Sequence, residues 1–324
     1  MARGGPSRAG GVCTASGVRY NAPPRPPMFL QQAEELPEFD RLWNFRDPAE
    51  TERRFREILP RAECAGTAAY LGELRTQIAR TLGLQRRFDE AHSLLDGVEE
   101  ALPSVASPRL RVRYLLERGR TLNSSKRPSE ARPLFLEAWE LGRKCGEHAL
   151  AVDAAHMMAI VEPPEEQLAW NLRAMEFAEK SHDERAKRWL GTLYNNIGWT
   201  HFEAKEYERS LEVHRKGLAW QEAHGTPRTL QIARWSVGRL LRALGRIDEA
   251  LPVQQALLAE VADPDAFVHE ELGECLLAKG RADEARAHFA KAHPLLAKEQ
   301  WIADSDPERL ARVARLAGFD QRPS

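Results

Sequence analysis

The chain has 324 residues, 43% of them hydrophobic and 29% charged, so it can form an apolar core beneath a well-solvated surface. Its formal net charge of -1 excludes a whole-chain basic field that would attract nucleic acid. No apolar run reaches the roughly 18 residues that span a bilayer, and the four widely spaced cysteines exclude a disulfide framework or a zinc knuckle.

Residues 1–33 contain no acidic residue, and prolines crowd residues 22–27. Such a segment cannot bury enough apolar surface to offset its chain entropy, so we expect a disordered tail rich in arginine, glycine and proline. A native start at Met28 and an organelle transit peptide are the alternatives. The prolines count against the transit peptide because they interrupt the amphipathic helix that such peptides need.

Residues 34–70 are expected to hold a leading helix or half repeat. In the sequence DPAETERRFREIL, at 47–59, Asp47 can cap a helix and Pro48 suits its first turn. This helix is interpreted as the second helix of an incomplete leading repeat.

Residues 71–303 read as helical throughout. Glycines and prolines separate amphipathic stretches, and no period-2 alternation flanked by hairpin turns is found. Six segments share one pattern: a small residue inside a first helix, a turn, and in most of them a small residue early in a second helix. The small residues of the six first helices are Ala79, Gly119, Ala155, Gly198, Gly238 and Gly273. Helices approach closely where side chains are small, so we expect these residues at contacts between paired helices.

This pattern resembles the tetratricopeptide repeat family, most clearly in YNNIGWTHFEAKEYERSLEVHRKG at 194–217. In the family's numbering of one repeat, the six small residues stand at position 8. Their spacings of 40, 36, 43, 40 and 35 residues exceed the family unit of about 34, as in the longer repeats of kinesin light chains. The resemblance covers residues 71–293 and implies an all-α superhelical solenoid of antiparallel helix pairs. The third repeat departs most, with the turn Glu162-Pro163-Pro164 and Gln167 in place of a small residue, so irregular packing is expected there.

Residues 304–324 are expected to form a capping helix and a tail. Asp306 can cap this helix, Pro307 follows it, and a solenoid needs such a cover over its last apolar face.

The resemblance implies that the first helices line a concave groove that binds a protein or an extended peptide. Position 6 is polar in every repeat: Gln77, Glu117, Asp153, Asn196, Ser236 and Glu271. Position 9 holds Arg80, Arg120, His156, Trp199, Arg239 and Glu274. The expected partner-binding residues are Arg80, Arg113, Arg120, Asn123, His156, Asn195, Asn196, Trp199, Phe202, Trp235, Arg239 and Arg242.

The residue types in this groove suggest what it would bind. Arginine binds carboxylates through paired hydrogen bonds, so an acidic part of the peptide is expected near Arg80, Arg113 and Arg120. Tryptophan and phenylalanine offer flat apolar anchors at the centre of the groove, and Glu270, Glu271 and Glu274 make its far end acidic. The alternative is a solvated face that binds nothing.

No catalytic motif is found: the sequence lacks a phosphate-binding loop, a nucleophile turn and a helical histidine pair for zinc. We therefore expect a cytoplasmic protein-binding scaffold that is not an enzyme, with no cofactor and no metal, and with neither nucleic acid nor membrane as partner. A self-associating structural solenoid and a small-ligand or peptide sensor are the alternative functions. The oligomeric state stays open.

Overall fold

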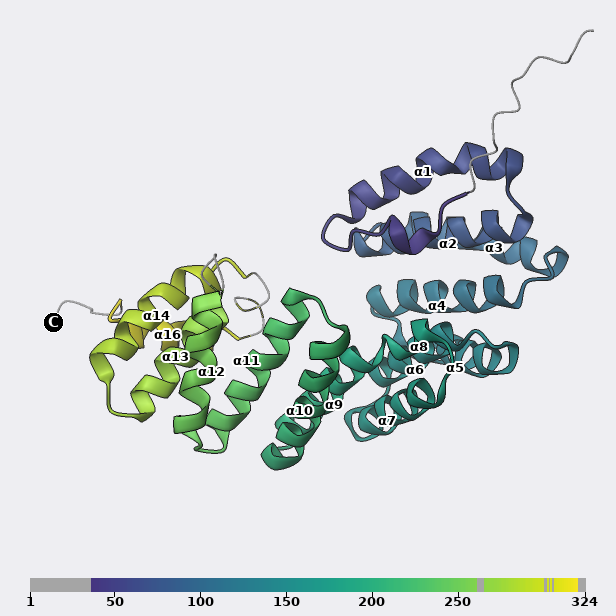
Figure 1. Cartoon of the computed structure of the whole chain (residues 1–324). Helices are drawn as coiled ribbons and strands as arrows, with labels where there is room; N and C mark the ends of the chain where they lie inside the picture. Colours follow the sequence, from purple (N-terminus) through teal and green to yellow (C-terminus); the bar gives the residue numbers. More distant parts are fainter. Residues whose placement is uncertain (1–35, 261–264, 300–301, 303, 305, 320–324) are drawn as a thin grey trace, which may run out of the picture. The chain divides into compact units, whose positions relative to one another are not determined.

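The computed structural model describes residues 36–260, 265–299, 302, 304 and 306–319 (Figure 1). The described helices all belong to one unit of the chain, Glu38–Ser324. The expected disordered tail at 1–33 lies outside the described residues. All regular secondary structure in the described part is helical, which confirms the all-α prediction. None of the described helices is long and apolar enough to cross a membrane.

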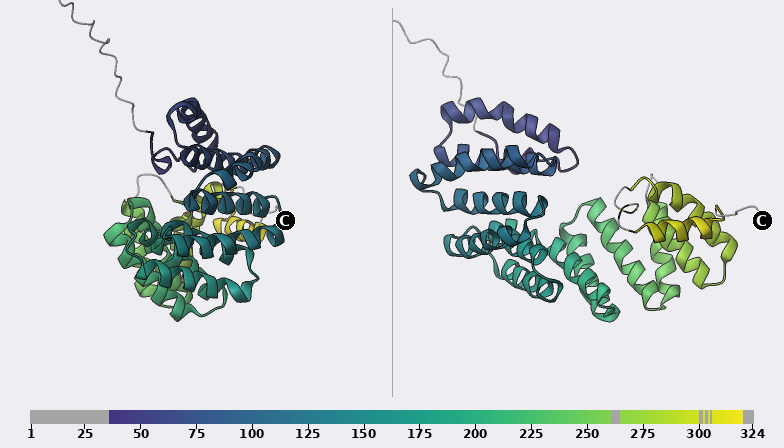
Figure 2. Two further views of the ribbon diagram at one scale, coloured as in Figure 1. Left: turned by 90° about the vertical axis from the view of Figure 1, so that its right-hand side faces the viewer. Right: turned by 180° about the vertical axis from the view of Figure 1, so that it is seen from behind.

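Successive helix pairs make up most of this unit (Figures 1 and 2). Among the described residues the pairs are α2 (Ala68–Leu84) with α3 (Phe88–Ala101), α4 (Pro108–Ser124) with α5 (Pro128–Cys145), α6 (His148–Val161) with α7 (Pro164–Lys180), α9 (Leu190–Glu203) with α10 (Tyr207–His224), α11 (Pro227–Ala243) with α12 (Ile247–Glu260), and α13 (Ala266–Ala278) with α14 (Ala282–Leu296). These six pairs correspond to the six repeats expected from the sequence.

Shorter elements lie before, between and after the pairs. The 3-10 turn η1 (Phe39–Arg41) and helix α1 (Pro48–Ala65) precede the first pair, and α1 packs against α2. The 3-10 turn η2 (Leu102–Ser104) follows α3, and α8 (Glu184–Lys187) stands between α7 and α9. Helix α16 (Pro307–Ala317) packs against α14.

Two helix starts were expected from capping residues, and both are confirmed. The side chain of Asp47 accepts a hydrogen bond from the backbone N–H of Glu50 at 2.9 Å, and that of Asp306 accepts from Arg309 at 3.2 Å. Each cap is followed by a proline, whose missing N–H is not needed in the first turn.

The small residues of the first helices lie where the paired helices approach most closely. A Cβ added to Gly119 would stand 2.5 Å from a ring carbon of Phe135, and one added to Gly273 would stand 2.9 Å from the ring of Phe289. Gly198 faces the ring of His214 in the same way. The sequence pattern therefore marks the seams between paired helices.

Five of the six pairs share one turn, in which a residue with positive φ follows the first helix. These residues are Arg86, Lys126, Lys205, Gly245 and Gly280. The next N–H then bonds back to a carbonyl of the first helix at 2.9 Å, which satisfies a free group at the helix end. The third pair differs, because Glu162 and Pro163 are extended. The irregularity expected in this repeat lies in this turn and in the inserted α8, which accounts for the spacing of 43 residues.

Candidate functional site

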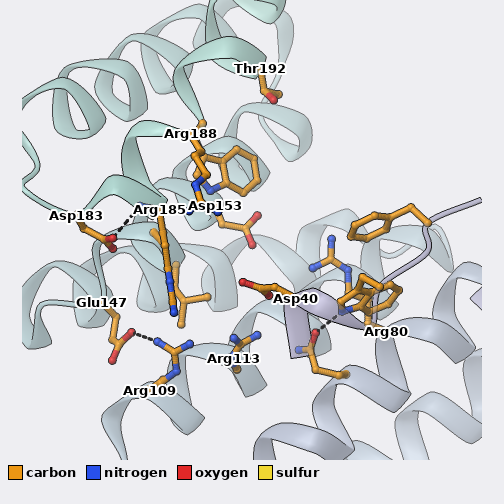
Figure 3. Close-up of a pocket in the computed structure, with 16 residues that line it drawn as sticks. Asp40, Arg80, Arg109, Arg113, Glu147, Asp153, Asp183, Arg185, Arg188 and Thr192 are labelled. Atoms are coloured by element: carbon orange, nitrogen blue, oxygen red, sulfur yellow. Dashed lines mark hydrogen bonds and ion pairs between the residues drawn. The ribbon is translucent and has the colours of Figure 1, made fainter. Parts of the chain in front are cut away.

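A hollow of about 540 Å³ lies on the face formed by α2, α4, α6 and α8, with the segment before α1 at its border (Figure 3). Its lining combines guanidinium groups with aromatic rings and a few carboxylates. The arginines are Arg80, Arg109, Arg113, Arg185 and Arg188, and the aromatic residues are Trp43, Phe45 and Trp189.

The segment before α1 forms one wall of the hollow. The indole N–H of Trp43 donates a hydrogen bond to Oε1 of Gln77 at 2.9 Å, and the rings of Trp43 and Phe45 stack with centroids 4.7 Å apart. Arg80 lies 5.4 Å from the first ring and 5.3 Å from the second, within cation–π distance. The side chain of Phe45 is nevertheless 60% exposed, so this wall presents an apolar surface to the solvent.

The side of the hollow formed by α4 carries two arginines that share one acid. Nε of Arg113 lies 2.8 Å from Oε2 of Glu73, and Nε of Arg109 donates to the same oxygen at 3.2 Å. Arg109 also bonds to Glu147 at 2.6 Å. Arg113 is only 8% exposed, and its side chain has this ion pair with Glu73 but no well-aligned hydrogen bond to any described residue. A buried guanidinium of this kind favours an added acceptor.

The opposite wall comes from α8 and the start of α9. Asp183 caps α8 by accepting a hydrogen bond from the N–H of Arg185, whose guanidinium lies 3.2 Å from Glu38. Arg188 is exposed, and its side chain has no hydrogen bond or ion pair within the described part of the chain. Trp189 lies against the ring of His156, with centroids 5.4 Å apart.

Beside the hollow, charged side chains link each first helix to the next. Arg80 lies 3.5 Å from Glu117, and Arg120 bonds to Glu117 at 2.6 Å and to Asp153. Burial alone would raise the pKa of Asp153, but Arg120 and Arg80 outweigh it and lower that pKa. Burial also disfavours the charge of Arg120, whose pKa is nonetheless raised by Asp153 and Glu117. Both groups therefore stay charged and paired.

The next link is neutral. The amide of Asn196 lies 3.2 Å from Nδ1 of His156. Burial lowers the pKa of His156, so a neutral ring is favoured at this contact.

A second cluster occupies α9 and α11. Arg239 lies among three aromatic rings, 5.7 Å from Trp199, 5.4 Å from Phe202 and 5.4 Å from Trp235. The indole N–H of Trp199 donates to Asn195 at 3.1 Å. All three aromatic residues are partly buried, and the ring of Trp199 contacts those of Phe202 and Trp235, with centroids 5.1 and 6.0 Å apart.

The acidic residues expected at the far end of the groove are paired. Arg242 forms two hydrogen bonds to Glu271, at 2.6 and 2.9 Å. Glu270 and Glu274 bind arginines of α16, namely Arg309 and Arg312.

The expected partner-binding residues thus fall into separate places. Arg80 and Arg113 line the hollow, whereas Arg120, His156 and Asn196 form links beside it. Asn195, Trp199, Phe202, Trp235, Arg239 and Arg242 lie farther along, and Asn123 is half-buried on the last turn of α4 and does not line the hollow.

Sequence reasoning missed Arg109, Arg185, Arg188 and Trp189. Three of them lie on or directly after α8, which belongs to no repeat position. The long spacing between Ala155 and Gly198 was the signal that could have pointed to an insertion there.

A model of the tetratricopeptide repeat family matches residues 190–225. Solved structures extend the likeness to most of the chain. A Signal Transduction ATPase with Numerous Domains from Pyrococcus horikoshii, described as having a tetratricopeptide repeat sensor, matches with a TM-score of 0.64 and 14% identity over 82% of this chain. The chain spans only 41% of that protein's length.

Two smaller proteins match over most of their own length. The apo form of RapI gives a TM-score of 0.67 and 12% identity, covering 88% of this chain and 81% of RapI. BtubC (BKLC) from P. vanneervenii gives 0.50 and 15%, covering 71% of this chain and 96% of BtubC. No curated protein matches the sequence. At these identities, the likenesses establish the fold.

Proposed function

Because the chain is a helical solenoid of the tetratricopeptide type, we propose that it is a scaffold that binds a protein or an extended peptide in the hollow between α2, α4, α6 and α8. One observation carries the proposal: Arg113 is buried at this hollow, and its guanidinium has an ion pair with Glu73, which it shares with Arg109, but no well-aligned hydrogen bond to any described residue. A ligand carboxylate there would accept the missing bonds.

The surroundings of Arg113 define the ligand further. Arg80, Arg109 and Arg120 already donate hydrogen bonds to acids, so a strongly acidic ligand has little to gain from them, whereas Arg113 has only its ion pair with the shared Glu73. Arg188, on the wall formed by α8, is an exposed guanidinium with no such partner among the described residues. The best fit is a peptide with one or two carboxylates directed at Arg113 and Arg188.

Apolar and polar positions complete the ligand's expected features. The stacked rings of Trp43 and Phe45 suit an apolar side chain of the peptide. Asp40, which is exposed at the same border, suits a cationic or amide group. We propose that the chain binds without catalysing a reaction. Free thiols at Cys64, Cys145 and Cys275 suit a reducing compartment such as the cytoplasm.

A random peptide library displayed on phage, selected against the full chain, tests this proposal. The selected peptides are then titrated against Arg113→Gln and Arg188→Glu. Each substitution should weaken binding by about ten-fold or more, because each removes a charge-assisted contact. Arg215→Glu is the matched control, since Arg215 is an exposed helical arginine outside the hollow.

Two results would count against the hollow as the binding site. Either no peptide is selected, or the selected peptides bind both variants as tightly as they bind the wild type. Circular dichroism and thermal melting of each variant establish that the fold is retained.

A further inference from the structure

A second group of arginines and aromatic rings lies on the second helices α5 and α7, outside the hollow described above. Trp139 contacts Trp170 and Phe177 edge to face, with ring centroids 6.2 and 5.2 Å apart. Both tryptophans are buried, at 6% and 7% exposure. The cluster borders a surface depression of about 490 Å³, which Arg143 and Arg173 also line.

The two arginines lie over the tryptophan rings. Cζ of Arg143 is 4.8 Å from the ring centroid of Trp139, and Cζ of Arg173 is 4.7 Å from that of Trp170. A guanidinium stacked in this way is held in orientation while the N–H groups at its edge remain able to donate. Each stack joins residues one turn apart on the same helix, so the helix itself fixes the geometry.

The donors at these edges are largely unused. The side chain of Arg173 has no hydrogen bond or ion pair with any described residue, and that of Arg143 has an ion pair only with Glu140, at 3.7 Å. Elsewhere in the chain, arginines at the start of second helices bind a glutamate three residues on through two hydrogen bonds. These arginines are Arg87, Arg127, Arg246 and Arg281. At the depression itself neither stacked arginine forms such a two-bond pair, because Glu140 lies 3.7 Å from Arg143 and Glu176 pairs with Lys180.

We propose that this surface, formed by Arg143 and Arg173 over Trp139 and Trp170, docks an acidic segment of a partner protein. Paired carboxylates would accept bonds from the edges of the two stacked guanidinium groups. Lys180, which also lines the depression, adds positive charge, although Glu176 pairs with it at 2.5 Å. The scaffold would then hold two ligands at once, one in the hollow and one on α5 and α7.

A nucleic acid fits this surface less well. Single strands bind proteins largely through bases stacked on aromatic faces. Here the faces of Trp139 and Trp170 are covered by the chain's own arginines, and the rings are buried.

The test is fluorescence anisotropy with a labelled oligoglutamate peptide and a labelled oligothymidylate, both titrated with the full chain. All proteins carry Arg188→Glu, so that the hollow contributes less to binding. Adding Arg143→Gln and Arg173→Gln should weaken oligoglutamate binding by about ten-fold, whereas adding Arg215→Gln should leave it unchanged. Protection of α5 and α7 from hydrogen exchange by the peptide should disappear in the same double variant.

Three outcomes would overturn the proposal: no binding of oligoglutamate, equal binding by the double variant, or a preference for oligothymidylate that the double variant loses. None of them bears on peptides selected for the hollow, so the two proposals fail separately.

Discussion

Single side chains connect each first helix to the next through a recurring contact. The residue at repeat position 9 of one first helix meets the residue at position 6 of the following one. The contacts are Arg80 with Glu117, Arg120 with Asp153, His156 with Asn196, and Arg239 with Glu271. The acidic members are buried at the helix junctions, where a lost partner is costly. At the junction of α9 with α11 the rings of Trp199 and Trp235 meet instead, 6.0 Å apart.

Glu117 is a buried acid that joins two arginines, so its removal should be clearly destabilising. It is 2% exposed and holds both Arg80 and Arg120. Glu117→Ala should lower the free energy of unfolding by about 3 kcal/mol, because it leaves the partly buried Arg80 without its acid and Arg120 with only Asp153. Urea denaturation measures this change. Glu90→Ala is the control, since its pair with Arg87 is exposed and should matter little. Equal losses in the two variants would show that the contact is not a structural link.

The candidate site could be predicted only in part at this scale. The repeat pattern placed positions 6 and 9 on one face of the first helices, and the structure places them there. The pairing between these positions depends on how far each hairpin is shifted against the next. The sequence of a single repeat does not specify this shift. Arg80 and Arg120 therefore looked free in the sequence, whereas Glu117 and Asp153 occupy them.

The conformation of the helices and of the turns between them is set largely by the residues within each element. Five turns use a residue with positive φ, and three of these residues are not glycine: Arg86, Lys126 and Lys205. Repeated use of the same turn gives each hairpin the same path, so the small residues meet the same partner positions. The pair α6 and α7 replaces this turn with extended Glu162 and Pro163.

Two glycines separate the effect of packing from that of helix propensity. A Cβ at Gly119 would lie 2.5 Å from the buried ring of Phe135. Gly97 is on the exposed surface of α3, and a Cβ there would have nothing within 4 Å. Gly119→Ala should lower the free energy of unfolding by about 1–3 kcal/mol through overpacking. Gly97→Ala should raise it by up to about 1 kcal/mol, because alanine favours helix. Thermal and urea unfolding measure both, and a stabilised Gly119→Ala would contradict the seam assignment.

Helix starts were predictable where a capping side chain and a proline stand together, as at Asp47 and Asp306. Helix α8 was not, because four residues between two repeats carry no periodic pattern. Arg185 and Arg188 line the hollow because α8 packs near α6, and the sequence does not show this packing.

Across the unit that holds the helices, both ends of the row of first helices are occupied by segments outside the repeats. At one end Trp43 bonds to Gln77, the position-6 residue that has no preceding hairpin. At the other end Arg312 binds Glu274, the position-9 residue of the last hairpin. Val313 and Ala317 of α16 also join the apolar cluster that contains Phe289.

Deleting residues 304–324 should therefore expose an apolar face and unpaired acids together. The full chain is expected to sediment at its monomer mass of 36.6 kDa at every concentration, and the truncated chain is expected to associate as concentration rises. Sedimentation velocity measures both. Arg309→Gln with Arg312→Gln is the control, because it removes the ion pairs but keeps the apolar cover. Association of the full chain would instead favour a self-assembling solenoid.

The contact between positions 9 and 6 bears on how such a chain can change length. If α4 and α5 were lost as one block, Arg80 would face Asp153, and a basic residue would again meet an acid. This hairpin can thus be removed or duplicated without a charge mismatch at positions 9 and 6, although its loss would also take Arg109 and Arg113 away from Glu73. An exchange that gave Asn196 a new partner in place of His156, such as Arg120, would instead set a neutral side chain against a charged one. Removal or duplication of hairpins is therefore favoured on the α4 side of this contact.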